Sequence, residues 1–395
     1  MKNTAGPPVM NEDFFDREKE QRLVWSKLET NNLLLLAPRR VGKTSLMLRF
    51  KKDATVHGYR CLFFSVEDIG DETVFVRKFY EKFCEVEGCE PILDRIMNSA
   101  VGKFLKKIKK VSGGGVGVEF GELSGDDWTQ LGKSLAHALN DIKESWLIEI
   151  DEVPLFVLKL LKLEDGQKRV RAFLGWLRVL RQEHPEIRWV LAGSIGLDTV
   201  TARLNMGDTI NDLQTVPLGP FSEESARRLL ETLADSYGYI LTPAVRDEIV
   251  RRVGWLLPYY LQIVFSLLRD NAPEHAAQWE PPLDLIPRIF DELLSPSNRN
   301  YFDYWRQRLT EELGAPDDRH ATMLLNTACQ DEAGSARQTL FQVLHVHVAD
   351  PDQCNDRLRY LLDILVNDGY LVEDGYRYRF RFGLLRDYWN RRVRA

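Results

Sequence analysis

Hydrophobic residues in the first half of the chain form short runs that alternate with amphipathic stretches. The runs at 33–36, 146–150 and 188–193 are almost entirely apolar, with Glu149 and Arg188 as the exceptions, which predicts buried strands. The stretch SLMLRFKK at 45–52 instead has apolar positions at helical spacing. This alternation from about residue 31 to 219 predicts a mostly parallel, three-layer α/β core with its ligand at the strand C-terminal ends.

The pattern changes after residue 219. FSEESARRLL at 221–230 predicts a helix with Ser222 as N-cap and Glu223 and Glu224 in the first turn. A small helical lid extends to about residue 275, and the proline-rich segment 271–287 marks a boundary. We therefore predict a core at 1–219, a lid at 220–275 and a C-terminal domain at 276–395.

The C-terminal domain has the pattern of a winged helix. Apolar periodicity predicts helices, a turn follows at 373–375, and residues 376–382 alternate strictly between aromatic residues and arginine. This alternation predicts a strand with aromatics on one face and arginines on the other. The core carries an insertion at 103–128 that joins a basic stretch to a glycine-rich one, which predicts a hairpin with its tip in solvent.

Composition narrows the function classes. The 395 residues are 44% hydrophobic and 28% charged, and the net charge of -6 gives no overall drive toward nucleic acid. The sequence shows no secretory signal and no apolar run of membrane-spanning length, so we expect a cytoplasmic protein. The five cysteines form no Cys-x-x-Cys pair, which argues against a disulfide framework and a zinc ribbon.

The C-terminal end is locally cationic. Seven arginines and one aspartate lie between Gly375 and Ala395. These arginines could neutralise DNA or RNA phosphates, bind an acidic protein surface, or pair with the chain's own acidic helices.

The segment LLLLAPRRVGKTSL at 33–46 follows the pattern strand, [AG]-x4-G-K-[ST], helix, which surrounds a triphosphate with backbone N–H groups. Position 37 only has to leave the strand, so alanine is tolerable there, whereas Gly42 lies where the backbone comes closest to phosphate. Lys43 would neutralise the β and γ phosphates and Thr44 would give a hydroxyl to Mg²⁺. The alternative is a basic turn between a strand and a helix. The remaining predicted nucleotide contacts of the loop are Pro38, Arg39, Arg40, Val41 and Ser45.

A second strand, at 146–150, ends in Asp151-Glu152 and supplies acidic groups that we expect beside the loop, on a neighbouring strand. Asp151 would hold Mg²⁺ and Glu152 would polarise the attacking water. Glu149 lies inside this strand, so we expect it to have a basic partner or to face another domain. Ser194, at the end of the third strand, could touch the γ phosphate or orient water, or be a plain turn serine.

With these residues, the chain resembles the AAA+-related STAND group of P-loop ATPases, and within it the archaeal-type ATPase family that also occurs in bacteria. The likeness extends over nearly the whole length and rests on FFDREKEQRLVWSKLE (14–29), APRRVGKTSL, IEIDEVP, AGSIGLD (192–198), VPLGPFSEESARRLL (216–230), VGWLLPYYLQ (253–262) and the closing residues 368–389. The resemblance implies a P-loop core, a helical lid and a winged helix.

It also implies that Arg17-Glu18 lies near the base and ribose, and that Gly254 to Pro258, with one extra residue, forms the lid segment that replaces an arginine sensor. A buried proline kink is the alternative for Pro258.

Two classes of function remain. The first is an ATP-hydrolysing switch that uses Mg²⁺ and couples turnover to oligomerisation or to binding of nucleic acid or a protein. Its transition state needs an arginine, for which Arg203 from a neighbouring subunit is the candidate, and Arg39 or Arg40 could instead lie over the phosphates. The second is a nucleotide-stabilised DNA- or protein-binding module with little turnover. A small-molecule kinase is disfavoured because no acceptor site is evident.

Overall fold

The computed structural model describes residues 1–394 except 87–126, 142–143, 194–195 and 275–277. The chain divides into two compact units. We call residues 17–37 and 46–217 the sheet unit, and residues 1–16, 38–45 and 218–395 the helical unit. The predicted hairpin insertion lies outside the described residues up to position 126, and the three-domain division stays a prediction.

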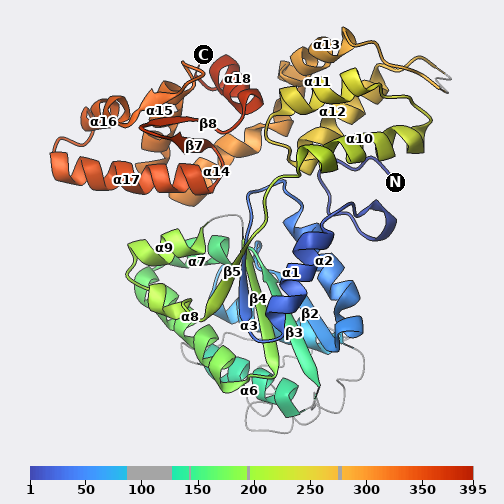
Figure 1. The fold of residues 1–395 in the computed structure, drawn as a ribbon. Coiled ribbons are helices and arrows are strands. Elements are labelled where there is room, and N and C mark those ends of the chain that lie inside the picture. Colours follow the sequence, from blue (N-terminus) through green and yellow to red (C-terminus); the bar gives the residue numbers. More distant parts are fainter. Residues whose placement is uncertain (87–126, 142–143, 194–195, 275–277, 395) are drawn as a thin grey trace, which may run out of the picture. The chain divides into compact units, whose positions relative to one another are not determined.

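The sheet unit is built on five parallel strands, as the alternation predicted (Figure 1). The sheet order is β2-β3-β4-β1-β5. Leu191 is level with Leu34 on one side and with Ile150 on the other, so the strands end at one edge of the sheet. The strands are β1 (Asn32–Leu36), β2 (Tyr59–Ser65), β3 (Ser145–Asp151), β4 (Ile187–Gly193) and β5 (Leu213–Pro217).

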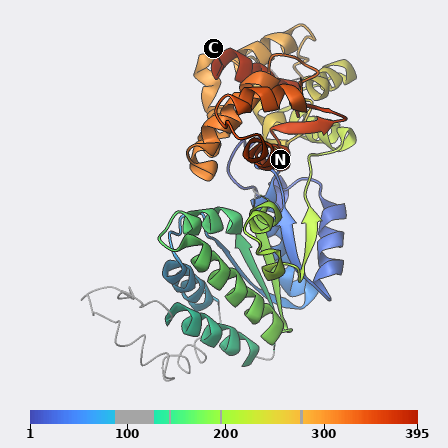
Figure 2. The same cartoon turned by 90° about the vertical axis from the view of Figure 1, so that its left-hand side faces the viewer.

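Helices cover both faces of this sheet, which gives three layers (Figures 1 and 2). One face packs into an aromatic-rich core in which Phe75 and Phe173 meet edge to face at 4.8 Å. On the other face, Trp25 packs against Phe50 at 5.5 Å. The first face is covered by α3 (Glu72–Cys84), α6 (Asp127–Asp141), α7 (Val153–Leu161), α8 (Gly166–Glu183) and α9 (Leu197–Arg203). The second is covered by α1 (Glu18–Leu28) and α2 (Lys43–Asp53), and short 3-10 turns η2 (Ala54–His57) and η3 (Gly207–Thr209) complete the unit.

The helical unit begins, after residue 217, with the helix that the sequence predicted. The hydroxyl of Ser222 accepts a hydrogen bond from the backbone N–H of Ser225 at 3.1 Å, so the predicted N-cap is confirmed. The first helices of the unit are α10 (Glu223–Tyr237), α11 (Pro243–Val253), α12 (Pro258–Asp270) and α13 (Leu285–Leu293), then η4 (Pro296–Tyr301) and α14 (Asp303–Leu313).

The remaining elements form a winged-helix-like arrangement with an antiparallel sheet of order β6-β8-β7. The predicted alternation is confirmed, because Tyr378, Phe380 and Phe382 are buried on one face. The strand is shorter than predicted, and Tyr376 is 91% exposed at the turn. The elements are α15 (Asp317–Ala328), β6 (Ser335–Ala336), α16 (Arg337–His345), α17 (Pro351–Asn367), β7 (Leu371–Asp374), β8 (Arg377–Phe380) and α18 (Gly383–Arg392).

The N-terminal segment belongs to the helical unit and includes the turn η1 (Asn11–Asp13). The backbone N–H of Thr4 donates to Gln262 Oε1 at 2.6 Å, and that of Val9 donates to Ser45 Oγ at 3.0 Å. The segment therefore connects helix α12 with the start of α2. Within the described part of the chain, no helix combines the length and apolar character needed to cross a bilayer.

Candidate functional site

The predicted phosphate loop joins β1 to α2, in the strand-loop-helix context that the pattern requires. The backbone N–H of Ala37 still donates to the carbonyl of Gly193 on β4, at 3.2 Å. Ala37 is 5% exposed and its φ is not positive, so this position continues the strand and makes no demand for glycine. The alanine is therefore compatible with the loop.

Two loop residues have left-handed backbone. The φ of Arg40 is 68° and that of Gly42 is 92°. A Cβ placed on Gly42 would meet no atom within 4 Å, so the space beside this glycine is open. An open backbone at the start of a helix is what an anion needs to approach the N–H groups.

The first residues of α2 are the predicted phosphate and metal contacts. Lys43 is 6% exposed and Ser45 8% exposed, while Thr44 is half-buried. A cation at a helix N-terminus opposes the positive end of the helix dipole. An anion bound at this N-terminus would be attracted by both charges. The other predicted loop contacts, Pro38 and Arg39, are half-buried, and Val41 is buried.

Asp151 is the last residue of β3 and is 2% exposed. Its Oδ1 accepts a hydrogen bond from the backbone N–H of Glu152 at 2.9 Å. Glu152 has a φ of 62° and stands directly before α7. Left-handed backbone in a non-glycine residue costs about 1–3 kcal/mol and concentrates at functional sites.

The expectation that the loop strand and the acidic strand are neighbours is wrong. β4 lies between β1 and β3, so their axes are two strand spacings, about 10 Å, apart. Both still end at the same edge, because all five strands run parallel. The end of β4, which leads to Ser194, is therefore central to the site; Ser194 itself lies outside the described residues.

A close contact that the sequence did not reveal joins β4 to the acidic segment. A Cβ on Gly193 would lie 2.2 Å from Cδ of Pro154, in the first turn of α7. Only a glycine at the end of β4 lets the segment after Glu152 approach so closely. In the sequence, only the pairs Ala192-Gly193 and Val153-Pro154 hint at this contact, because they combine a glycine with a proline.

Glu149 is fully buried, and its hydrogen-bonding partner is not basic as expected. The Cys61 thiol donates to its Oε2 at 3.4 Å, and its Oε1 has no hydrogen-bond partner among the described residues. Burial raises the pKa of Glu149 well above its usual value, and the Asp151 charge adds to this. Lys51 lowers this pKa only as the smallest cause. The hydrogen bond from Cys61 lowers the pKa, but burial is the larger cause and favours the protonated form of this carboxyl.

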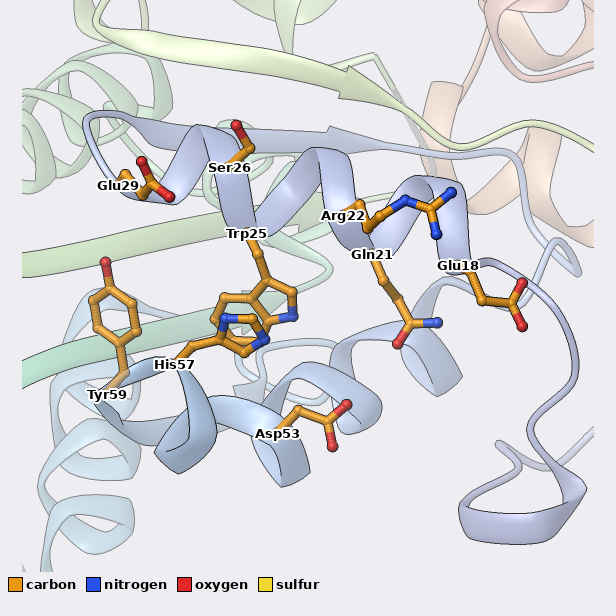
Figure 3. Close-up of a pocket in the computed structure, with 9 residues that line it drawn as sticks. All are labelled: Glu18, Gln21, Arg22, Trp25, Ser26, Glu29, Asp53, His57 and Tyr59. Atoms are coloured by element: carbon orange, nitrogen blue, oxygen red, sulfur yellow. The ribbon is translucent and has the colours of Figure 1, made fainter.

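Arg17, expected near the base and ribose, directly precedes α1. It is 5% exposed, has a φ of 75°, and its Nη1 donates to Glu20 at 2.7 Å. Glu18 lines an open hollow of about 560 Å³ with Trp25, which stacks on His57 at 3.9 Å (Figure 3). Acidic groups outnumber cationic ones around this hollow, so it is unsuited to a triphosphate.

Pro258 is the first residue of α12, where proline fits without disturbing the helix. The alternative of a proline kink is therefore wrong. Arg203, the candidate arginine finger, is the exposed last residue of α9.

Arg40, one of the two loop arginines predicted to contact nucleotide, packs against aromatic rings. Its guanidinium carbon lies 4.2 Å from the ring centre of Tyr259 and 4.7 Å from that of Tyr304. Each such contact contributes about 0.5–2 kcal/mol. No sequence pattern around the loop indicated this contact.

Across the described ranges there is no cluster of three or more His, Cys, Asp or Glu side chains suited to holding a metal ion. A cation at this site would therefore depend on oxygen groups of the loop and β3 together with a bound phosphate. Thr44 and Asp151 are oxygen donors of the kind that Mg²⁺ prefers.

No family model matches the sequence, and no curated protein is significantly similar to it. Solved structures are similar over nearly the full length. The Walker-type ATPase of Pyrococcus abyssi has 17% identity and a TM-score of 0.64, with 98% of this chain and 99% of that chain covered. The ORC2 protein of Aeropyrum pernix, in complexes with ADPNP and ADP, has 12% identity and a TM-score of 0.55, with 96% of both chains covered. The chain therefore has the fold of an AAA+ P-loop ATPase, as the resemblance implied.

Proposed function

We propose that the chain binds ATP with Mg²⁺, hydrolyses it, and works as a nucleotide-dependent switch. The observation that carries the proposal is the arrangement at one sheet edge. A loop with open backbone leads into a helix that starts with a buried lysine, and a parallel strand ends at the same edge in a buried aspartate followed by a strained glutamate. Phosphoryl transfer needs the reacting groups to be positioned and the charge of the transition state to be stabilised. This arrangement of residues would supply both.

In this proposal, the loop from Pro38 to Gly42 and the N-terminus of α2 bind the phosphates. Lys43 neutralises the β and γ oxygens, while Thr44 and Asp151 hold Mg²⁺. When bound there, Mg²⁺ would supply charge stabilisation at the phosphate oxygens. Glu152 accepts a hydrogen bond from the attacking water, and Ser194 contributes a hydroxyl from the end of β4.

Arg203 is proposed to act on a neighbouring copy. It lies exposed at the end of α9, where a side chain can reach another molecule. Hydrolysis per subunit should then rise with protein concentration. The variant Arg203→Ala should bind ATP normally and lose this dependence, whereas wild-type turnover that does not vary with concentration would remove the trans role.

For the C-terminal domain, we propose a protein partner over duplex DNA. The exposed positions of α17, the third helix of the winged-helix arrangement, include Asp352, Asp356 and Asp363. Carboxylates there repel phosphate oxygens. All seven arginines between 375 and 395 also have partners within the chain; for example, Arg379 pairs with Asp374 at 3.3 Å and Arg391 pairs with Asp291 at 3.4 Å.

The main test measures ATP affinity, phosphate release and native mass with Mg²⁺. Lys43→Ala should weaken ATP binding by roughly a hundredfold or more, because a charge-assisted phosphate contact is lost. Glu152→Gln should bind ATP, lose turnover by roughly a hundredfold or more, and trap the loaded assembly. Lys168→Ala, which removes an exposed lysine paired with Asp165, is the matched control and should change neither.

Two results would contradict the proposal in different ways. ATP binding that is equal in wild type and Lys43→Ala would remove the phosphate-loop assignment. Full turnover in Glu152→Gln would remove only the role of that glutamate. Binding without any turnover in wild type would favour the nucleotide-stabilised binding module.

A further inference from the structure

Arg40 is the loop residue whose surroundings point beyond phosphate binding. Its guanidinium stands between Tyr259, the second residue of α12, and Tyr304, the second residue of α14. Among the described residues, no carboxylate forms an ion pair with Arg40. The two rings therefore provide its surroundings, and all three residues belong to the helical unit.

The two tyrosines are the edge of a continuous aromatic cluster. Tyr260 follows Tyr259 with ring centres 5.2 Å apart, and the indole N–H of Trp305 donates to the Tyr260 hydroxyl at 2.7 Å. Trp305 also meets Tyr370 at 4.8 Å, and the Tyr370 hydroxyl donates to the Trp305 carbonyl at 2.7 Å. Tyr370 directly precedes β7, so the cluster reaches from the loop arginine into the winged-helix-like part.

The backbone of Arg40 gives this contact a consequence for the loop. Its left-handed φ of 68° is unfavourable for a residue with a Cβ and persists only when the surroundings enforce it. The rings fix the guanidinium and thereby hold the backbone two residues before Gly42. Without the rings the loop would populate other conformations, and ATP would have to reorder it on binding.

We propose that Arg40 is a positioning residue that holds the phosphate loop against the aromatic cluster of α12 and α14. We call the contact of Arg40 with Tyr259 and Tyr304 the latch. The latch preorganises the loop for ATP and couples nucleotide binding to the packing of the winged-helix-like part. A partner that binds this part and changes its packing should therefore change the affinity for ATP. Because coupling is reciprocal, ATP should change the affinity for that partner by the same factor. The inference rests on the proposed nucleotide function and adds the route of its regulation.

The test is a double-mutant cycle on ATP affinity with the full-length chain. Tyr304→Leu removes one ring and should weaken ATP binding by roughly fivefold or more, the lower range of allosteric coupling. Tyr304→Phe keeps the ring and should stay within roughly twofold, because the ring face carries the interaction with the cation. In an Arg40→Ala background, Tyr304→Leu should have no further effect, because the arginine through which it acts is gone.

The same cycle on thermal unfolding without nucleotide gives an independent readout. The two substitutions should be non-additive there as well, since each breaks the same contact. If Tyr304→Leu does not fold, Tyr259→Leu tests the other ring with the same expectation.

The outcomes separate this inference from the proposed function. Additive effects on ATP affinity, or equal effects of leucine and phenylalanine at position 304, overturn the latch while ATP binding stands. Wild-type protein that binds no ATP overturns the proposed function and the regulation together.

Discussion

Charged side chains have opposite surroundings in the two regions that the sequence marked as functional. At the loop and the edge of the parallel sheet, Lys43 is 6% exposed and Asp151 2% exposed. In the C-terminal hairpin of β7 and β8 with the arginines that follow it, which we call the wing, the side chains of Arg377 and Arg379 are 45% and 41% exposed. Burying a charge costs several kcal/mol, whereas an exposed ion pair contributes about 0–1 kcal/mol.

The difference teaches how to weigh the two regions. In the proposed function, the buried lysine at the N-terminus of α2 and the buried aspartate at the end of β3 bind the nucleotide and its metal ion, which would account for two charged groups in buried positions. Arg377 and Arg379 instead face water and pair with Asp331 and Asp374, so these two charges are satisfied within the chain. Charge count alone would have ranked the wing first, whereas burial ranks the sheet edge first.

The largest loss in the free energy of unfolding should come from a substitution at Gly193, which makes the close contact with Pro154 at the sheet edge. Gly193→Ala places a methyl group 2.2 Å from Cδ of Pro154, so the strand end or the proline ring has to shift. We expect the free energy of unfolding to fall by about 1–3 kcal/mol, measured by denaturant unfolding. ATP hydrolysis should fall as well, because Pro154 is two residues from Glu152.

Gly175→Ala is the matched control for this substitution. Gly175 lies inside α8, and an added Cβ would meet no atom within 4 Å. Alanine should stabilise this helix by up to about 1 kcal/mol. Equal effects at the two glycines would mean that the Gly193 contact does not hold the site.

The sequence predicted the local structure of both regions well. The apolar runs placed β1, β3 and β4 within about one residue, because a buried strand has a continuous apolar signature. The serine N-cap of α10 and the alternation in the wing were also confirmed, since each depends on neighbours in sequence. Such features are encoded locally.

Contacts between segments distant in sequence could not be predicted. The position of β4 between β1 and β3, the thiol beside Glu149 and the tyrosines around Arg40 all depend on tertiary packing. Periodicity reports which face of a strand is buried but not which strand lies beside it. No pattern of residues along the chain links position 40 to position 304.

An intermediate effect, on how the free energy of unfolding depends on pH, should come from Glu149→Gln. Because the folded-state pKa of Glu149 is raised, its protonated form favours folding; that stability is complete below the ordinary value of 4.5 and is lost as pH rises through the folded-state pKa. Glutamine keeps the shape and does not ionise. Measured without Mg²⁺, the variant should therefore gain stability over wild type as pH rises, by at most about 1.4 kcal/mol per pH unit.

Glu81→Gln, at an exposed position of α3, is the control and should show no such trend. If the difference between Glu149→Gln and wild type is the same at pH 5 and pH 8, Glu149 does not titrate as a buried neutral carboxyl.

The smallest change in the free energy of unfolding is expected for Arg379, which we compare with Arg381 at the next alternate position. Arg379 makes an exposed ion pair with Asp374, so Arg379→Gln should change the free energy of unfolding by less than about 0.5 kcal/mol. Arg381 instead donates to the carbonyls of Val366 and Leu371, both at 3.1 Å, and lies over the Trp255 ring at 5.2 Å. Arg381→Gln leaves these carbonyls without their donor and should cost about 1–3 kcal/mol.

Urea unfolding of both variants measures the difference. A larger loss for Arg379→Gln than for Arg381→Gln would show that exposure does not rank these charges, and the contrast between the wing and the sheet edge would lose its physical basis.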